Sequence, residues 1–149
     1  MREQSEPKMK HGVRRRAREM ALQLLFQHEF IAAENERLDS RVILRRFVED
    51  FAIEADVADY GGELFLGVLR HSGEIDSLIQ KQSAHWKLQR MGLVDLSIMR
   101  VATFEMKFLN PLLAPNVAIN EAIELAKKYG TTESGSFVNG ILDHLAKSL

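Results

Sequence analysis

The chain has 149 residues, a formal net charge of −1, 46% hydrophobic residues and 28% charged residues, which are ordinary values for one globular domain. It contains no cysteine, which excludes disulfides, thiolate metal ligands and cysteine nucleophiles and suits a reducing compartment such as the cytoplasm. No apolar run reaches the roughly 18 residues that a membrane span needs, so no membrane partner is expected.

The N-terminal end is strongly basic. Residues 1–18 contain seven Lys or Arg and two Glu, a net charge of +5, which leaves −6 for the rest of the chain. We expect residues 1–12 to form a short flexible basic arm. A basic end on an acidic body suits an anionic partner at that end.

Apolar residues recur at helical spacing along nearly all of the chain. The pattern predicts helices over 13–33, 40–51, 55–70, 72–83, 93–109, 117–129 and 134–147, with a turn or short helix near 85–90. Pro111 and Pro115 mark the longest break. About seven helices joined by short loops, and no sign of a sheet, predict an all-α helical bundle over residues 13–149.

The first helix has two stripes. The inward stripe is apolar and consists of Val13, Ala17, Met20, Ala21 and Leu24. The second stripe, roughly opposite, consists of Arg15, Arg18, Glu19, Leu22 and Phe26. Arginine forks grip phosphates and an aromatic face stacks on an unpaired base. The second stripe could therefore bind single-stranded nucleic acid. Alternatively, Leu22 and Phe26 pack on a second layer of helices and the arginines are only solvated.

The fifth helix is apolar on two sides, because Leu96, Met99 and Met106 lie opposite its main apolar arc. Such a helix is central, or its second side is covered by a partner. Glu105 falls inside the arc, where a buried carboxylate needs a partner or a proton. A structural ion pair is the expected role, because no second acid is placed for catalysis.

The sixth helix should end at Gly130 in a left-handed stop. The following loop, Gly130 to Ser136, has the glycine spacing of a phosphate loop but lacks its lysine and follows a helix, so a nucleotide triphosphate site is excluded. Its backbone N–H groups can take a single phosphate, or Thr131 or Thr132 can cap the last helix.

No pattern of catalytic or metal-binding residues occurs. The five histidines never pair at i,i+3 or i,i+4, and H-E-x-x-H and G-x-S-x-G are absent. We therefore expect no catalytic residue, no metal, no cofactor and no enzymatic activity.

Three motifs in order resemble one family. R-R-R-A-R-E-x-A-x-Q-x-L-F at 14–26, N-V-A-I-N-E-A-I-E-L-A-K-K-Y-G at 116–130 and S-F-V-N-G-I-L-D at 136–143 are similar to the NusB transcription antitermination factors. The resemblance implies two helical subdomains, roughly 13–83 and 84–149. It also implies binding of boxA RNA together with the ribosomal protein NusE, in the RNA polymerase antitermination complex that transcribes ribosomal RNA operons.

The resemblance further implies roles for individual residues. Those expected on the RNA side are Arg14, Arg15, Arg16, Arg18, Phe26, Glu133 and Phe137. Those expected on a partner-binding side are Leu22, Asp95, Leu96 and Met99. Two alternatives remain open: a helical protein–protein adaptor without direct RNA binding, and a self-associating regulator that forms a homodimer.

Overall fold

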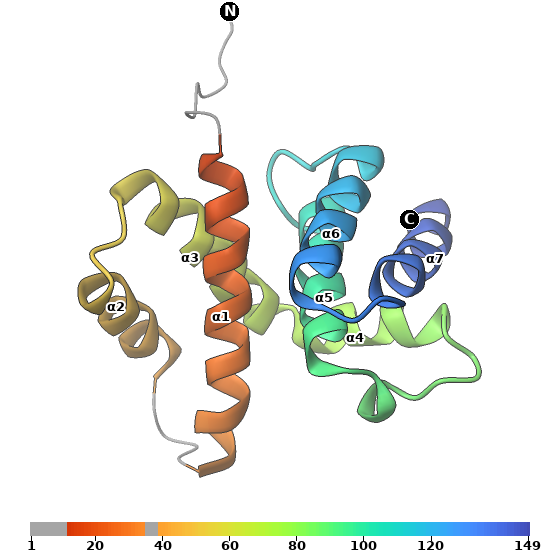
Figure 1. Cartoon of the computed structure of the whole chain (residues 1–149), viewed down its shortest axis with the longest axis horizontal. Coiled ribbons are helices and arrows are strands. Elements are labelled where there is room, and N and C mark those ends of the chain that lie inside the picture. Colours follow the sequence, from red (N-terminus) through yellow and green to blue (C-terminus); the bar gives the residue numbers. More distant parts are fainter. Residues whose placement is uncertain (1–11, 35–38) are drawn as a thin grey trace, which may run out of the picture. The chain divides into compact units, whose positions relative to one another are not determined.

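A computed structural model describes residues 12–34 and 39–149 (Figure 1). These residues form seven α-helices, one short 3-10 helix and no strand, which confirms the predicted all-α fold. The elements are α1 Val13–Glu34, α2 Ser40–Asp50, α3 Ala55–Arg70, α4 Ser72–Lys81, η1 Leu88–Arg90, α5 Leu93–Lys107, α6 Pro115–Tyr129 and α7 Ser134–Lys147. Apart from Gly12, the expected basic arm lies outside the described residues.

The chain divides into two compact units, residues 1–63 and 64–149. The division falls inside α3 and not at 83/84, where a subdomain boundary was expected. The physical reason lies in α4, which buries Ile75 and Ile79 and packs against α5 and α7. Residues 72–83 therefore belong to the second unit.

In the first unit, two adjacent glycines let α3 approach both of its neighbours. A Cβ atom at Gly61 would lie 2.7 Å from Met20 Sδ and 3.1 Å from the carbonyl oxygen of Ala17, both on α1. A Cβ atom at Gly62 would lie 3.1 Å from Leu44 Cδ2 on α2. The absence of a side chain at both positions therefore lets α3 lie close to α1 and α2. The predicted inward stripe of α1 is buried throughout.

In the second unit, α5 is the central helix. It packs against α4, α6 and α7 (Figure 1), and every residue from Leu96 to Met106 except Arg100 is buried. The sequence left open whether α5 is a central helix or has a second apolar side covered by a partner, and the structure shows that it is central. Glu105, 1% exposed, is buried as expected, while its ion pair stays a prediction.

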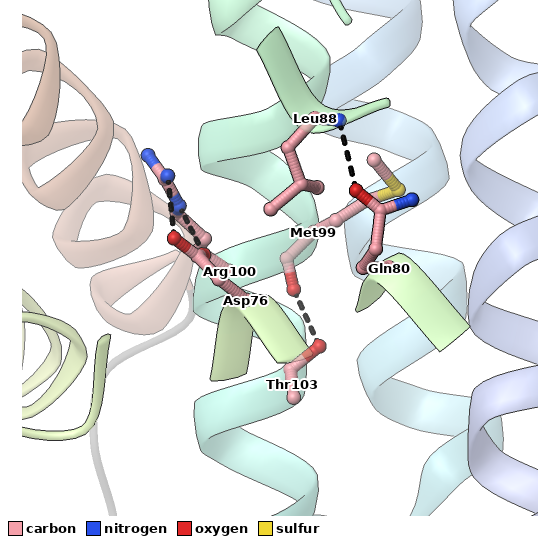
Figure 2. Close-up of polar contacts among 6 residues, drawn as sticks. All are labelled: Asp76, Gln80, Leu88, Met99, Arg100 and Thr103. Carbon is pink, nitrogen blue, oxygen red and sulfur yellow. Dashed lines mark hydrogen bonds and ion pairs between the residues drawn. The ribbon is translucent and has the colours of Figure 1, made fainter. Parts of the chain in front are cut away.

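Polar contacts tie α5 to α4 (Figure 2). The guanidinium of Arg100 donates from Nε to Asp76 Oδ1 at 2.8 Å and from Nη2 to Asp76 Oδ2 at 2.9 Å, a bidentate pair that is largely shielded from solvent. Within α5, the hydroxyl of Thr103 donates to the carbonyl oxygen of Met99 at 2.7 Å. The first contact joins two helices, whereas the second satisfies a buried hydroxyl locally.

Replacing Asp76 by alanine should lower the free energy of unfolding by about 1.5–3 kcal/mol, because it leaves the shielded guanidinium of Arg100 without its carboxylate. Urea unfolding measures this. The matched control is Asp143→Ala, which breaks an ion pair of 3.2 Å with Lys147 whose side chains are 53% and 72% exposed. That variant should lose less than about 1 kcal/mol. Equal losses in the two variants would contradict a structural role for the Arg100–Asp76 pair.

Candidate nucleic-acid interface

The first turn of α1 gathers three arginines at a helix N-terminus. Gly12 has a left-handed φ of +89° directly before the helix, and its carbonyl oxygen accepts a hydrogen bond of 2.9 Å from the backbone N–H of Arg16. Arg14, Arg15 and Arg16 thus lie at the positive end of the helix dipole, in a turn that contains no acidic residue. Cations destabilise this end of a helix, whereas an anionic ligand would be stabilised by both the dipole and the arginines.

The buried ring of Tyr60 orders two of the arginines. The Cζ atom of Arg14 lies 5.3 Å from the ring centroid and that of Arg18 lies 5.9 Å from it. Arg18 is only 3% exposed, so it does not stand open on the second stripe of α1, and its expected role in RNA binding stays a prediction. Its guanidinium is enclosed beside Tyr60, whereas Arg14 is half-buried and Arg15 is exposed. A cation–π contact of this kind holds the arginine in one position.

Arg16 has a carboxylate partner at the surface. Its Nη2 lies 2.7 Å from Oε1 of Glu54, and the two side chains are 50% and 68% exposed. An exposed pair of this kind stabilises the fold by about 1 kcal/mol at most. A phosphate can therefore displace Glu54 from Arg16 at little cost in stability.

The second stripe of α1 is divided between interior and surface. Leu22 is buried, with 8% exposure, so the expectation that it lies on an open partner-binding surface is wrong. Arg18 and Leu25 are buried as well, which shows that more than one side of α1 is covered. Phe26 is half-buried, and its ring meets the 60% exposed Phe30 edge-on at 5.8 Å between centroids. Phe30 is not among the residues predicted from the sequence, although its i,i+4 spacing from Phe26 signals an aromatic pair.

Replacing Phe26 by alanine should weaken RNA binding by about 1–3 kcal/mol if a base stacks on the ring. Its cost in folding stability should stay below the roughly 3–5 kcal/mol of a core Phe→Ala change, because the ring is only half-buried. Phe47→Ala, at a ring that is 8% exposed in the same unit, is the matched core variant. Thermal unfolding beside a binding titration separates the two effects. A large stability loss with normal RNA binding would assign Phe26 to the core.

In the second unit, Glu133 and Phe137 lie one helical turn apart at the start of α7. Glu133 is the exposed N-cap residue, and Phe137 is half-buried and donates its backbone N–H to the carbonyl oxygen of Glu133 at 3.0 Å. The expected cap by Thr131 or Thr132 is wrong, because the N-cap is Glu133 and its side chain makes no capping hydrogen bond. Ser134 closes the loop instead, accepting from the backbone N–H of Thr131 at 2.9 Å.

Gly130 is also not the left-handed stop that was expected. Its φ is −98°, which any residue can adopt. A side chain is excluded there for steric reasons, because a Cβ atom would overlap the Ser134 side chain and lie 2.8 Å from the carbonyl oxygen of Ala126. The loop borders an open groove of about 380 Å³ whose only charged lining residue is Lys127. A single phosphate at this loop stays a prediction.

The side of α5 predicted to bind a partner exposes fewer residues than expected. Leu96 is 6% exposed and Met99 is fully buried, so the expectation that they form an open apolar side is wrong, because α5 is enclosed by its neighbours in the second unit. Asp95 lies in the first turn of α5 and is half-buried. Its partly exposed apolar neighbours are Leu93 and Val94.

Within residues 12–34 and 39–149, no group of three His, Asp or Glu side chains is placed to hold a metal ion. In the same part of the chain, no helix combines the length and the apolar character needed to cross a membrane.

Several known proteins are similar to this chain in both sequence and fold. A model described as the NusB family matches residues 15–147. The chain is 45% identical over 142 residues to the transcription antitermination protein NusB of Bdellovibrio bacteriovorus, covering 94% of this chain and 99% of the relative. A T. maritima NusB structure matches with a TM-score of 0.78 and 36% identity over 97% of this chain and 93% of that one. A crystal structure titled as the antitermination factors NusB and NusE in complex with dsRNA matches with a TM-score of 0.80 and 26% identity, over 94% and 100%.

Proposed function

The chain belongs to the NusB family of transcription antitermination proteins, and from this premise we propose that it binds boxA-like single-stranded RNA together with NusE. One observation carries the RNA part: Arg14, Arg15 and Arg16 occupy a helix N-terminus that they destabilise and that an anionic ligand would neutralise. The family consists of transcription factors and not of enzymes, so the role proposed is binding alone.

The finer proposal is that the protein acts within the RNA polymerase antitermination complex, notably on ribosomal RNA operons. Transcription in bacteria takes place in the cytoplasm, which is therefore the compartment proposed. The basic N-terminal end, with a net charge of +5 over residues 1–18, supports an approach to nascent RNA.

Gel-shift titrations with boxA-like RNA, scrambled RNA of equal length and a duplex of the boxA-like sequence test the proposal, each with and without NusE. The duplex is included because a related NusB structure contains dsRNA. We expect the boxA-like strand to bind best and NusE to strengthen its binding. A protein that binds NusE but no RNA would instead be a helical adaptor, and RNA binding that weakens as a homodimer forms would favour the self-associating regulator.

Replacing Asp95 by lysine should lower the affinity for NusE, mainly through slower association. A carboxylate beside the partly exposed Leu93 and Val94 suits a basic protein, and ribosomal proteins are usually basic. Binding of RNA by this protein alone should hold steady or improve, because the change adds positive charge. Calorimetric titration of NusE into the folded variant measures the effect.

Asp95 also lies in the first turn of α5, where a negative charge stabilises the helix dipole. If that is its whole role, the variant should lose stability on the order of 0.3–1 kcal/mol and keep wild-type affinity for NusE. Asp76→Ala is a useful control for stability, since it weakens the contact between α4 and α5 and leaves Asp95 in place. Unchanged NusE affinity for Asp95→Lys would remove the residue from the partner site.

A further inference from the structure

The loop between α4 and α5 presents an aromatic ring to solvent. Trp86, the only tryptophan of the chain, is 51% exposed. Ser83 and Met91 anchor the two ends of the loop in the interior, each with 8% exposure. Between them, only Leu88 is partly shielded, so the indole lies in a segment that is largely open to solvent.

The side chain of Gln80 fixes this loop. Its Nε2 donates to the carbonyl oxygens of Ser83 and Trp86, both at 3.1 Å. Its Oε1 accepts from the backbone N–H of Leu88 at 3.1 Å (Figure 2). The Ser83 hydroxyl donates to the same Trp86 carbonyl at 3.0 Å. Because the backbone on both sides of the indole is held, binding a ligand to the ring costs little loop entropy.

The charged residues next to the ring along the chain are of one sign. Residues 77–94 contain Lys81, Lys87 and Arg90 but no Asp or Glu, and all three cations are exposed. An aromatic face among cations is the arrangement that binds single-stranded nucleic acid, because the base stacks and the phosphates meet positive charge. Phe51, which is 66% exposed, differs: its neighbours along the chain include Glu49, Asp50 and Glu54, whose charge would repel a phosphate backbone.

We propose that Trp86 is a stacking platform for an unpaired RNA base, with Lys87 and Arg90 contacting the adjoining phosphates. The inference rests on the proposed RNA-binding function and adds to the α1 arginines a contact in the second unit of the chain. Gln80 holds the backbone on both sides of the indole.

The single tryptophan makes the test direct. Single-stranded RNA should quench the emission of Trp86 and protect it from acrylamide, with the same dissociation constant that a gel shift gives. Trp86→Ala should weaken binding by about fivefold to a hundredfold, and Trp86→Phe should keep most of the affinity. Lys87→Ala and Arg90→Ala should each flatten the slope of log affinity against log salt by about 0.7. Phe51→Ala is the matched control and should bind as the wild type does.

The outcomes separate this inference from the function on which it rests. Normal RNA binding by Trp86→Ala, with wild-type emission unchanged by RNA, would overturn the inference and leave the RNA function standing. Emission that changes only when NusE is added would make the loop a protein contact and would also overturn it. If the wild-type protein binds no RNA in the gel shift, both fail together.

Discussion

Alanine in place of Phe104 should lower the free energy of unfolding by about 3–5 kcal/mol, because the ring is buried in the interior of the second unit. Phe104 is 4% exposed, and its ring centroid lies 6.1 Å from that of His71 and 6.3 Å from that of Phe108. The ring also lies directly against Gly67 of α3, where an added Cβ atom would overlap it. Urea unfolding followed by circular dichroism measures the loss.

A double-mutant cycle tests whether Gly67 and Phe104 share one space. Gly67→Ala alone should cost about 1–3 kcal/mol, despite the better helix propensity of alanine, because the ring has to move. Combined with Phe104→Ala, its cost should largely disappear, since the cavity accepts the new methyl group. The control is Gly140→Ala, where nothing lies within 4 Å of the added atom and stability should hold or rise. Additive losses in the cycle would contradict the close contact.

Replacing Arg14, Arg15 and Arg16 together by alanine should weaken RNA binding about a hundredfold at 0.1 M salt. Each phosphate contact on a single strand contributes about 0.7 to the slope of log affinity against log salt, so three contacts flatten that slope by about 2. Helical content should be nearly unchanged, because alanine favours a helix and removes cations from the positive end of the dipole. Filter binding over a salt series measures both quantities.

The matched control removes the same charge from another helix. Arg41, Arg45 and Arg46 are all exposed on α2 of the same unit, and their triple alanine variant lowers the net charge equally. It should show only a small, nonspecific loss of RNA affinity. An unaltered salt slope in the α1 variant, or equal losses in the two variants, would show that the α1 arginines do not hold RNA.

The helical period and the proline and glycine breaks predict the elements well. Every predicted α-helix is present, and each end lies within two residues of the expected one, because these signals are local. The predicted boundary between the units, at 83/84, is wrong because no local signal marks the observed one. The observed boundary lies within the continuous helix α3, where no change of composition marks it.

The errors at the candidate site have a common origin. A helical wheel separates the sides of a helix but does not say how many of them are covered, so Leu22, Leu96 and Met99 were assigned to open surfaces and are buried. The contacts that organise the arginines also have no local signal. Tyr60 and Glu54 are separated from their arginine partners by about forty residues, and only the packing of α3 on α1 brings them together.

The cations in the first turn of α1 imply a trade-off between stability and function. Neutral or acidic residues there would relieve repulsion with the helix dipole and make the unbound protein more stable. Selection for heat resistance alone would therefore replace these arginines. Engineering of this chain for a higher melting temperature should therefore exclude the start of α1, because a stabilising change there would cost binding.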